Sequence, residues 1–378
     1  MRTAIVHDWL VSLSGAERVL LELHKMFPEA PIYTLFHDKV FTSKYFPDAE
    51  IRSSFLQRIP LITKRHKYLF FLMPTAIESF DLSDFDLVIS SSAIFSKGLV
   101  LKPRTRHICY CYSPTRQLWD LNAQKIGNCL SAGKAGKFEI GNYVGKHFLR
   151  LWDRQASDRV DEFVAISKHV QQRIWKYYRR NAKIIYPPCD INSKSEILNP
   201  KQIQNSKLKI ENFDNYYLIV SRLYLHKNID VAIEAFNKLN LPLVIIGTGP
   251  EQKRLRQKIE NNRITMLGFI ADEQLPYYYL NCRAFILPQE EDFGITPIEA
   301  MSFGKPVLAL RKGGAIETIM EGVTGEFFDD PIAEGLADGI RRLEENYPNY
   351  NSDKIKLHSQ AFLGTNFRDK IMELINYK

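Results

Sequence analysis

The chain has 378 residues, of which 45% are hydrophobic and 25% are charged, so it has the composition of a folded protein and the length of two domains. Gly and Pro are too few for a fibrous or low-complexity chain, and the longest mainly apolar stretch, residues 68–77, is about half of a membrane span. The amino terminus lacks an apolar signal core, because Asp8 interrupts it, so we expect a cytoplasmic protein.

The positive charge is unevenly distributed: residues 1–190 carry a formal charge of +10, and residues 191–378 carry −2. A one-sided positive field attracts phosphate groups on lipids, nucleotides or nucleic acids. For any single basic segment, the alternative explanation is ordinary solvated Lys and Arg side chains. Lys64, Arg65 and Lys67 directly precede the apolar residues 68–73. This pattern predicts peripheral binding to an anionic membrane surface.

The five cysteines are an odd number without a CxxC pair or a neighbouring histidine at a zinc spacing. We expect buried, reduced thiols at Cys109, Cys111, Cys129, Cys189 and Cys282.

Short apolar runs alternate with helix-length amphipathic segments, which predicts an α/β fold with parallel sheets. The longest predicted helix covers residues 137–159. In the first half the predicted strands are residues 3–7, 31–35, 87–90, 107–111, 163–166 and 183–186, and in the second half they are residues 217–221, 243–246, 265–267, 284–287, 307–310 and 325–328.

A polar stretch, residues 191–215, separates the two halves and predicts a linker between domains 1–190 and 216–365. Two doubly wound, Rossmann-like domains that face each other would bind ligand in a cleft at the carboxyl ends of both sheets.

Three segments carry residues suited to ligand binding. In the first, a strand is followed by Gly15 and a helix start, which can form an anion site but is more often a simple turn. In the second, Arg222 and Lys227 follow the first strand of the second domain and precede a helix. Two cations in this position are equally consistent with a diphosphate site and with a pair of solvated loop charges.

The third segment is ILPQEEDFGITPIEAMSFGKPVLAL, in which an acidic loop precedes a short helix predicted at residues 297–303. Thr296 is predicted as its N-cap and Gly304 as its C-terminal cap. Glu299 then has two interpretations, a capping-box partner of Thr296 or a ligand-binding carboxylate. Glu290, Glu291 and Asp292 concentrate acceptors for the hydroxyls of a sugar.

The pattern E-x-F-G-x-x-x-x-E with E-A-M-x-x-G-x-P-V, preceded by R-x-x-x-x-K, resembles the retaining nucleotide-sugar glycosyltransferases of family 4, which have the GT-B fold. SGAERVL, CYCYSPTRQLWD, VDEFVAISKHVQQRIWKYYRRNAKIIYPPCD and VIIGTGPE agree with the same family in the same order, so the resemblance covers nearly the whole chain.

The resemblance implies that Glu291 binds the hydroxyls of the donor sugar, Glu299 binds the ribose, and Arg222 and Lys227 bind the diphosphate. It further implies that backbone amides of Phe293, Gly294, Ile295 and Thr296 line the sugar and phosphate, that Phe269 and Ile270 border the base, and that Gly15 approaches from the other domain. A C-terminal helix, residues 366–378, is expected to cross back to the first domain.

The chain departs from the family pattern at two positions. Ser14 replaces one of two common glycines, and Tyr112 replaces a histidine that contacts the sugar in C-H-T-P. The Tyr112 phenol can still donate a hydrogen bond, but a donor preference taken from relatives with histidine does not transfer.

The family implies transfer with retention on one face of the sugar, with Glu291, Arg222 and Lys227 as the central groups and no metal or other cofactor. Within the family, the chain resembles bacterial envelope and exopolysaccharide glycosyltransferases such as those of the heterocyst envelope polysaccharide, and this resemblance favours UDP-glucose as the donor. The expected acceptor is a polysaccharide or a lipid-linked oligosaccharide. A GDP-mannose-dependent mannosyltransferase and a nucleotide-sugar 2-epimerase of the same fold are the alternatives.

Two further classes of protein fit the sequence less well. A metal-dependent transferase would use the string Asp84-Phe85-Asp86, but this string precedes a predicted strand, where turn and capping roles are favoured. A module that only binds anions leaves the carboxylate motif without a role, and we do not expect nucleic acid as a partner.

Overall fold

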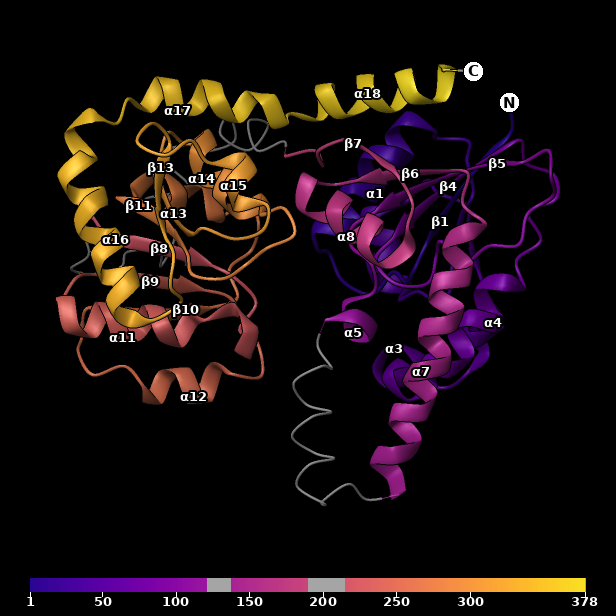
Figure 1. Cartoon of the computed structure of the whole chain (residues 1–378), viewed down its shortest axis with the longest axis horizontal. Helices are drawn as coiled ribbons and strands as arrows, with labels where there is room; N and C mark the ends of the chain where they lie inside the picture. The colour runs from indigo at the N-terminus through magenta and orange to yellow at the C-terminus, as the bar shows by residue number, and fades with distance from the viewer. Residues whose placement is uncertain (121–136, 190–214, 378) are drawn as a thin grey trace. The chain divides into compact units, whose positions relative to one another are not determined.

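Two parallel sheets, of seven and six strands, organise the computed structural model, which describes residues 1–120, 137–189 and 215–377. The chain divides into unit 1, residues Met1–Pro188 with Phe367–Lys378, and unit 2, residues Cys189–Asn366. Each unit contains one sheet with helices on both faces (Figure 1). The predicted linker, residues 191–215, lies outside the described residues except for Asn215.

The sheet of unit 1 has the strand order β3-β2-β1-β4-β5-β6-β7. Its strands are β1 (Thr3–His7), β2 (Ile32–Thr34), β3 (Ile51–Ser53), β4 (Leu87–Ser92), β5 (Arg106–Cys111), β6 (Glu162–Ala165) and β7 (Ala182–Ile184). Apolar runs predicted six of these strands to within two residues. They missed the edge strand β3, whose central residue Arg52 is exposed and therefore breaks the apolar pattern.

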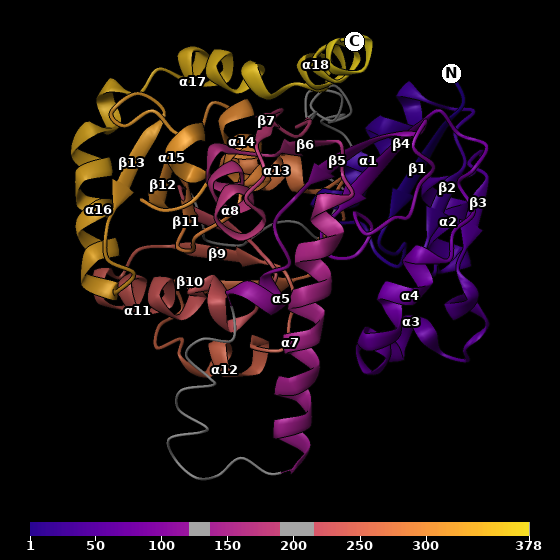
Figure 2. The same ribbon diagram turned by 45° about the vertical axis from the view of Figure 1, so that its right-hand side comes forward.

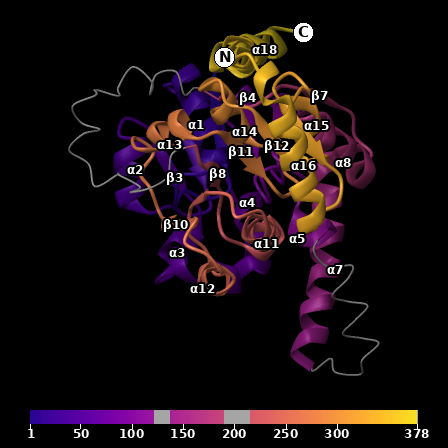
Figure 3. The same cartoon turned by 90° about the vertical axis from the view of Figure 1, so that its left-hand side faces the viewer.

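The helices of unit 1 lie on both faces of this sheet. They are α1 (Gly15–Met26), α2 (Lys39–Tyr45), α3 (Ile62–Arg65), α4 (Met73–Glu78), α5 (Arg116–Trp119), α7 (Lys137–Asp158) and α8 (Lys168–Tyr178), with 3-10 helices η1 (Phe55–Arg58) and η2 (His66–Leu72). Figures 1 and 2 place α3 and α4 on the same side of the sheet as α7. The beginning of α7 extends beyond the sheet, as Figure 3 shows most clearly.

The carboxylate of Asp8, at the end of β1, is buried and accepts four backbone hydrogen bonds. The N–H groups of residues 93–96, which follow β4, donate to its two oxygens at 2.7–2.8 Å. Four donors compensate for the desolvation of one buried charge. Asp8 therefore fixes the turn after β4 to the end of β1.

A second buried charge connects three helices of unit 1. Asp153 of α7 pairs with Lys97 at 2.6 Å, and both side chains are 1% exposed. Its oxygens also accept hydrogen bonds from Thr115, Trp119 and Tyr178 at 2.7–2.8 Å. Because every donor here is directed at one carboxylate, the orientations of α5, α7 and α8 are mutually constrained.

The C-terminal helix α18 (Gly364–Asn376) belongs mostly to unit 1. Phe367 packs edge-on against Tyr110, with ring centroids 5.5 Å apart. Arg368 pairs with Glu22 of α1 at 2.8 Å, and Arg106 donates to the carbonyls of Leu374 and Ile375. Residues from both ends of the chain thus complete one domain.

Unit 2 has a second parallel sheet with the order β10-β9-β8-β11-β12-β13. Its strands are β8 (Tyr217–Val220), β9 (Leu243–Ile246), β10 (Ile264–Gly268), β11 (Ala284–Leu287), β12 (Val307–Leu310) and β13 (Gly325–Phe328). Its helices are α11 (Ile229–Leu239), α12 (Gln252–Gln257), α13 (Leu275–Asn281), α14 (Ile295–Ser302), α15 (Ala315–Thr318), α16 (Ala333–Asn346) and α17 (Ser352–Ser359), with 3-10 helices η3 (Leu225–Lys227), η4 (Tyr347–Asn349) and η5 (Gln360–Phe362). All six strands match the predicted apolar runs.

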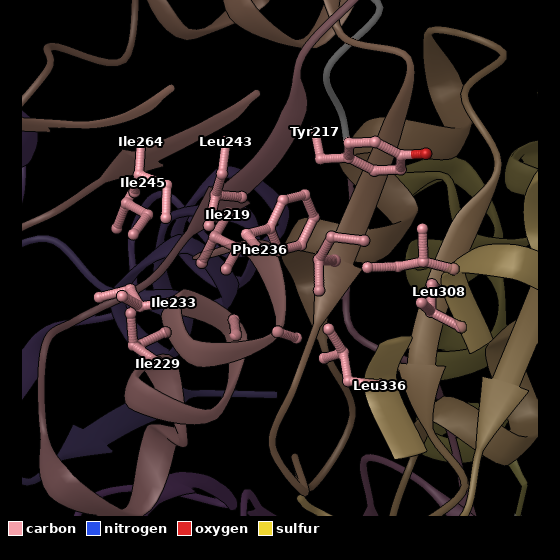
Figure 4. Packing of buried hydrophobic residues seen from close by; sticks show 14 of the residues in the cluster. Tyr217, Ile219, Ile229, Ile233, Phe236, Leu243, Ile245, Ile264, Leu308 and Leu336 are labelled. Atoms are coloured by element: carbon pink, nitrogen blue, oxygen red, sulfur yellow. The ribbon is translucent and has the colours of Figure 1, made fainter. Parts of the chain in front are cut away.

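The core of unit 2 lies between its sheet and the helices α11 and α16. Figure 4 shows Phe236 of α11 among strand residues such as Ile219, and Leu336 of α16 near Leu308. These residues are fully or almost fully buried. The side chains that alternate with them on the strands face the opposite helices, so the strands are apolar throughout.

The cysteines in the described residues are free and buried, at Cys109, Cys111, Cys189 and Cys282, while Cys129 lies outside the described residues. No helix within the described ranges combines the length and the apolarity needed to cross a bilayer.

We expect Asp8→Asn to lower the free energy of unfolding of unit 1 by about 3 kcal/mol, because the amide nitrogen would face backbone N–H groups that need an acceptor. All four tryptophans (Trp9, Trp119, Trp152 and Trp175) lie in unit 1, so tryptophan fluorescence during urea unfolding reports on this unit. Asp84→Asn, at a largely exposed carboxylate, is the control and should change stability little. Equal stability of the two variants would contradict the structural role of Asp8.

Candidate active site

The candidate site of unit 2 lies where its strand order reverses, between β8 and β11. Arg222 and Lys227 follow β8, and the acidic segment 290–292 follows β11. In doubly wound sheets, connections leave such a switch point in opposite directions and open a crevice at the carboxyl ends of the strands. The structure therefore brings the second and third sequence motifs to one place.

Two glycines allow the loop after β9 to contact the loop that carries Arg222. A Cβ on Gly247, whose φ is +136°, would lie 1.9 Å from the carbonyl oxygen of Ser221, and one on Gly249 would lie 2.3 Å from that of Leu223. The Leu223 N–H donates to Thr248, and the Gly247 N–H donates to Gly268. The loops after β8, β9 and β10 thus form one hydrogen-bonded edge.

Lys227 and Glu291 contact each other directly. The Lys227 ammonium is almost fully buried and lies 2.5 Å from Oε1 of Glu291, and the amide of Gln289 donates to the same oxygen at 2.9 Å. Asn228 holds the two loops together by donating to the Pro288 carbonyl at 3.1 Å. The residue expected to bind the diphosphate and the residue expected to bind the sugar are therefore neighbours.

Arg222 differs from Lys227 in its surroundings. It is exposed, and its guanidinium lies 5.8 Å from the ring centroid of Tyr224. The two cations therefore combine a fixed, buried charge with an exposed one that can reach an anion in solution.

The helix after the acidic loop begins earlier than predicted. It is α14, residues Ile295–Ser302, and its N-cap is Gly294 with φ +90°. The prediction of Thr296 as N-cap is wrong, because a glycine can adopt the left-handed conformation that turns the chain into the helix two residues sooner. Glu299 is consequently the fifth helical residue, and the capping-box interpretation does not hold.

Gly304 does follow the end of α14 as expected, with φ +72° and its N–H donating to Met301.

The loop before α14 is packed tightly. The Gly314 N–H donates to the Glu291 carbonyl, and a Cβ on Gly314 would lie 2.5 Å from Cα of Phe293. Phe293 is itself buried against Phe362, with centroids 5.8 Å apart. The backbone amides of residues 293–296 therefore lie at the start of a helix whose position is well defined, and such a helix start attracts anions.

Glu299 is 4% exposed, and its Oε2 accepts a hydrogen bond from the hydroxyl of Tyr279 at 2.6 Å. Sequence reasoning missed Tyr279, which lies in the run YYY, where nothing distinguishes one tyrosine from the next. Phe269 follows Gly268 at the end of β10 and is 77% exposed, with Ile270 next to it. The two residues expected to border the base thus lie on the same edge of the sheet as Arg222.

The other two sequence-predicted site residues, Gly15 and Tyr112, lie in unit 1. Gly15 is the first residue of α1, which follows β1, and Tyr112 follows β5. The Tyr112 hydroxyl donates to the Ala16 carbonyl at 3.0 Å and lies 2.8 Å from Ser91 Oγ. Burial raises the pKa of this phenol well above its ordinary value. Tyr112 therefore contacts the start of the helix that Gly15 begins.

Sequence reasoning also missed two buried polar residues around this helix start. His7 lies 3.0 Å from Ser91 and 3.4 Å from Glu17, and Glu17 accepts from the Ser14 N–H at 2.9 Å. Burial raises the pKa of Glu17, but the hydrogen bonds from His7 and Ser14 outweigh burial and lower it overall. The pattern Ser14-x-x-Glu17 before an apolar helix is a capping-box signature and could have been recognised.

The Asp84-Phe85-Asp86 string lies at the amino end of β4, where Asp86 accepts a hydrogen bond from the Arg2 N–H at 2.8 Å. Its position at the amino end of a strand, opposite the edge where the loops after the parallel strands lie, favours the turn role. In the part of the chain that the structure describes, no three His, Cys, Asp or Glu residues gather as a metal site would require.

Comparison with known families identifies both halves of the chain. The model "Glycosyltransferase Family 4" matches residues 13–193, and the model "Glycosyl transferases group 1" matches residues 200–356. The chain belongs to glycosyltransferase family 4.

Several relatives matched by sequence are named as mannosyltransferases. The chain is 27% identical to the alpha-1,3/1,6-mannosyltransferase of Candida glabrata over 46% of each chain, and 23% identical to that of Saccharomyces cerevisiae over 85% of this chain and 72% of the relative. With the Candida glabrata and Dictyostelium discoideum enzymes, the match spans about half of the relative's length.

Solved structures share the GT-B fold of family 4 over the whole chain. HepE from Anabaena in complex with UDP-glucose is 20% identical with a TM-score of 0.68, and the match covers 100% of both chains. WaaG, a glycosyltransferase involved in lipopolysaccharide biosynthesis, is 16% identical with a TM-score of 0.69, again over 100% of both chains.

The tight contact between the loops after β8 and β9 leads to a prediction. Gly247→Ala should weaken nucleoside diphosphate binding at least tenfold, because its Cβ would displace the Ser221 carbonyl and with it the neighbouring Arg222. Gly322→Ala is the control, since Gly322 also has a positive φ, +74°, but nothing within 4 Å of its Cβ. Calorimetric titration of both variants with UDP and GDP measures the effect. If the two variants bind these nucleotides with equal affinity, the contact between Gly247 and Ser221 does not position Arg222.

Proposed function

We propose that this protein is a retaining glycosyltransferase that transfers a hexose from a nucleotide diphosphate sugar to a glycan acceptor. One observation carries this proposal. Two cations, a helix start and two carboxylates lie together at the point in unit 2 where the strand order reverses. Membership of family 4 supports the proposal. A diphosphate needs the cations and amides, and a sugar nucleotide needs the carboxylates for its hydroxyls.

In this proposal Arg222, Lys227 and the amides of residues 293–296 bind the diphosphate. Glu299 accepts hydrogen bonds from the ribose, and Glu291 accepts them from the sugar. Phe269 and Ile270 border the base. No metal or other cofactor takes part, because the cations and the helix start supply the positive charge.

The pair of Lys227 and Glu291 changes partners when the donor binds. The diphosphate competes for the Lys227 ammonium, and the sugar hydroxyls replace that ammonium at the Glu291 carboxylate. Lys227 exchanges a carboxylate for the diphosphate, and Glu291 exchanges an ammonium for sugar hydroxyls, so neither group is left buried without a polar partner.

The reaction breaks the bond between the anomeric carbon and the diphosphate oxygen and forms a bond from that carbon to an acceptor oxygen on the same face. The proton of the acceptor hydroxyl passes to the departing phosphate oxygen. Negative charge grows on the diphosphate as it leaves, and Arg222, Lys227 and the start of α14 stabilise this charge.

UDP-glucose is the favoured donor, since the full-length structural relative HepE was solved with UDP-glucose. GDP-mannose is the second candidate, because several of the relatives matched by sequence are named as mannosyltransferases. Binding of one nucleotide and not the other decides between them.

The acceptor is a polysaccharide or a lipid-linked oligosaccharide, and a basic apolar surface of unit 1 supports the lipid-linked form. Exposed apolar side chains on η2 and α7 form this surface, and the Phe71 ring lies against Gly145, which makes the two elements continuous. Its apolar members are Tyr68, Phe71, Leu72, Val144, Phe148 and Leu151. Lys64 and Arg65 are exposed beside it, and residues 51–77 contain no acidic side chain.

The two glutamates are expected to respond differently to substitution. Glu299→Gln should weaken binding of the free nucleoside diphosphate by about 1–3 kcal/mol, because a neutral amide loses charge assistance toward the ribose hydroxyls. Glu291→Gln should not weaken it, since Lys227 is then released for the phosphate, but it should lower transfer from the intact donor.

Calorimetry with UDP, UDP-glucose, GDP and GDP-mannose, in the presence of EDTA, measures both effects. If both variants bind and transfer like the wild type, the carboxylates are structural and the proposal fails. Binding that appears only when Mn²⁺ replaces EDTA would instead contradict metal independence alone.

Membrane binding is tested by vesicle flotation. The protein should partition to anionic vesicles more than to neutral ones, with about 1 kcal/mol per surface cation, and salt should weaken the binding. Phe148→Ser should reduce partition, whereas Leu357→Ser, at an exposed leucine of unit 2, should leave it unchanged. Equal partition to both vesicle types would exclude the anionic surface as a partner.

A further inference from the structure

The hydrogen bond between Tyr279 and Glu299 connects α13 to the ligand-binding helix α14. The phenol donates to Oε2 at 2.6 Å, and the two residues are 1% and 4% exposed. The contact is therefore shielded from water, and this shielding strengthens a hydrogen bond to a charged group.

The ring of Tyr279 has little freedom to move. It stacks on Phe303 with centroids 5.7 Å apart and planes 7° from parallel, and it lies 6.0 Å from Phe285. Phe303 follows α14 directly, so the same helix that carries Glu299 also helps to hold the tyrosine. The hydroxyl is thus fixed relative to the carboxylate that it contacts.

The two carboxylates of the site differ in the partner that holds them. Glu291 is held by the cation of Lys227, whereas Tyr279 holds Glu299 through a neutral donor. A neutral donor orients a carboxylate without adding a positive charge beside it. A carboxylate oriented in this way suits a ligand with two adjacent O–H donors.

We propose that Tyr279 is a positioning residue for nucleotide binding, which orients Glu299 so that it accepts both hydroxyls of a ribose diol. This inference rests on the proposed role of Glu299. It predicts that Tyr279 affects the affinity for the nucleotide and leaves the chemical step at saturating donor unchanged, because it contacts no reacting atom.

The test compares Tyr279→Phe with Tyr216→Phe, a matched control in the same unit. The buried hydroxyl of Tyr216 donates to the Tyr278 carbonyl at 2.8 Å, so both variants lose one buried hydrogen bond of a tyrosine. Calorimetry with UDP and GDP should show an affinity about tenfold lower for Tyr279→Phe and within about twofold of wild type for Tyr216→Phe. The KM for the donor should rise in Tyr279→Phe with kcat retained.

A double-mutant cycle with Glu299→Gln shows whether Tyr279 acts through Glu299. The double variant should bind no more weakly than Glu299→Gln alone, because the substitutions remove one shared interaction. Additive losses, or equal effects of the Tyr279 and Tyr216 variants, would overturn the inference. If Tyr279→Phe does not fold, Phe303→Leu, which keeps the hydroxyl but removes its ring support, should weaken binding instead, and unchanged affinity there would also overturn it.

The outcomes separate this inference from the proposed function. If Glu299→Gln weakens nucleotide binding but Tyr279→Phe does not, only the positioning role fails. If wild type binds neither UDP nor GDP, or Glu299→Gln is silent, the proposed role of Glu299 fails and the inference fails with it.

Discussion

The reversal of strand order beside the first strand of each unit is the constraint that places the central groups of both domains. In unit 1 the order turns between β1 and β4, and in unit 2 it turns between β8 and β11. Parallel strands end at the same edge, and at a reversal the connecting segments leave in opposite directions. Asp8, Gly15, Arg222 and Glu291 all follow a strand that borders such a reversal.

These edges hold buried charges, and each charge has partners that satisfy it. Asp8 accepts four backbone N–H groups and Asp153 accepts four side-chain donors, which makes both of them fixed parts of the scaffold. Lys227 and Glu291 instead face each other across two loops. An ion pair of this kind can exchange its partners for those of a charged ligand, whereas a carboxylate bound by backbone amides cannot do so without unfolding a turn.

Three glycines and a tyrosine fix the positions of the loops and of one carboxylate in the site of unit 2. Gly247 and Gly314 let neighbouring backbones approach to distances that a Cβ would prevent, and Gly294 turns the chain into α14. Tyr279 then orients the carboxylate that this helix presents. The groups near the ligand are therefore held by contacts that come from loops and helices far apart in the sequence.

Local sequence patterns were sufficient to predict the α/β class, all six strands of unit 2 and the family, because buried parallel strands are apolar throughout and the glycosyltransferase motifs are local. They did not predict β3, whose pattern Arg52 interrupts, or the start of α14, where the left-handed conformation of Gly294 outweighed the capping preference of Thr296. The contacts of Lys227 with Glu291 and of Tyr279 with Glu299 arise from tertiary packing and have no local sequence signal. Those contacts join residues 64 and 20 positions apart, and the sheet order that brings them together depends on the packing of the whole domain.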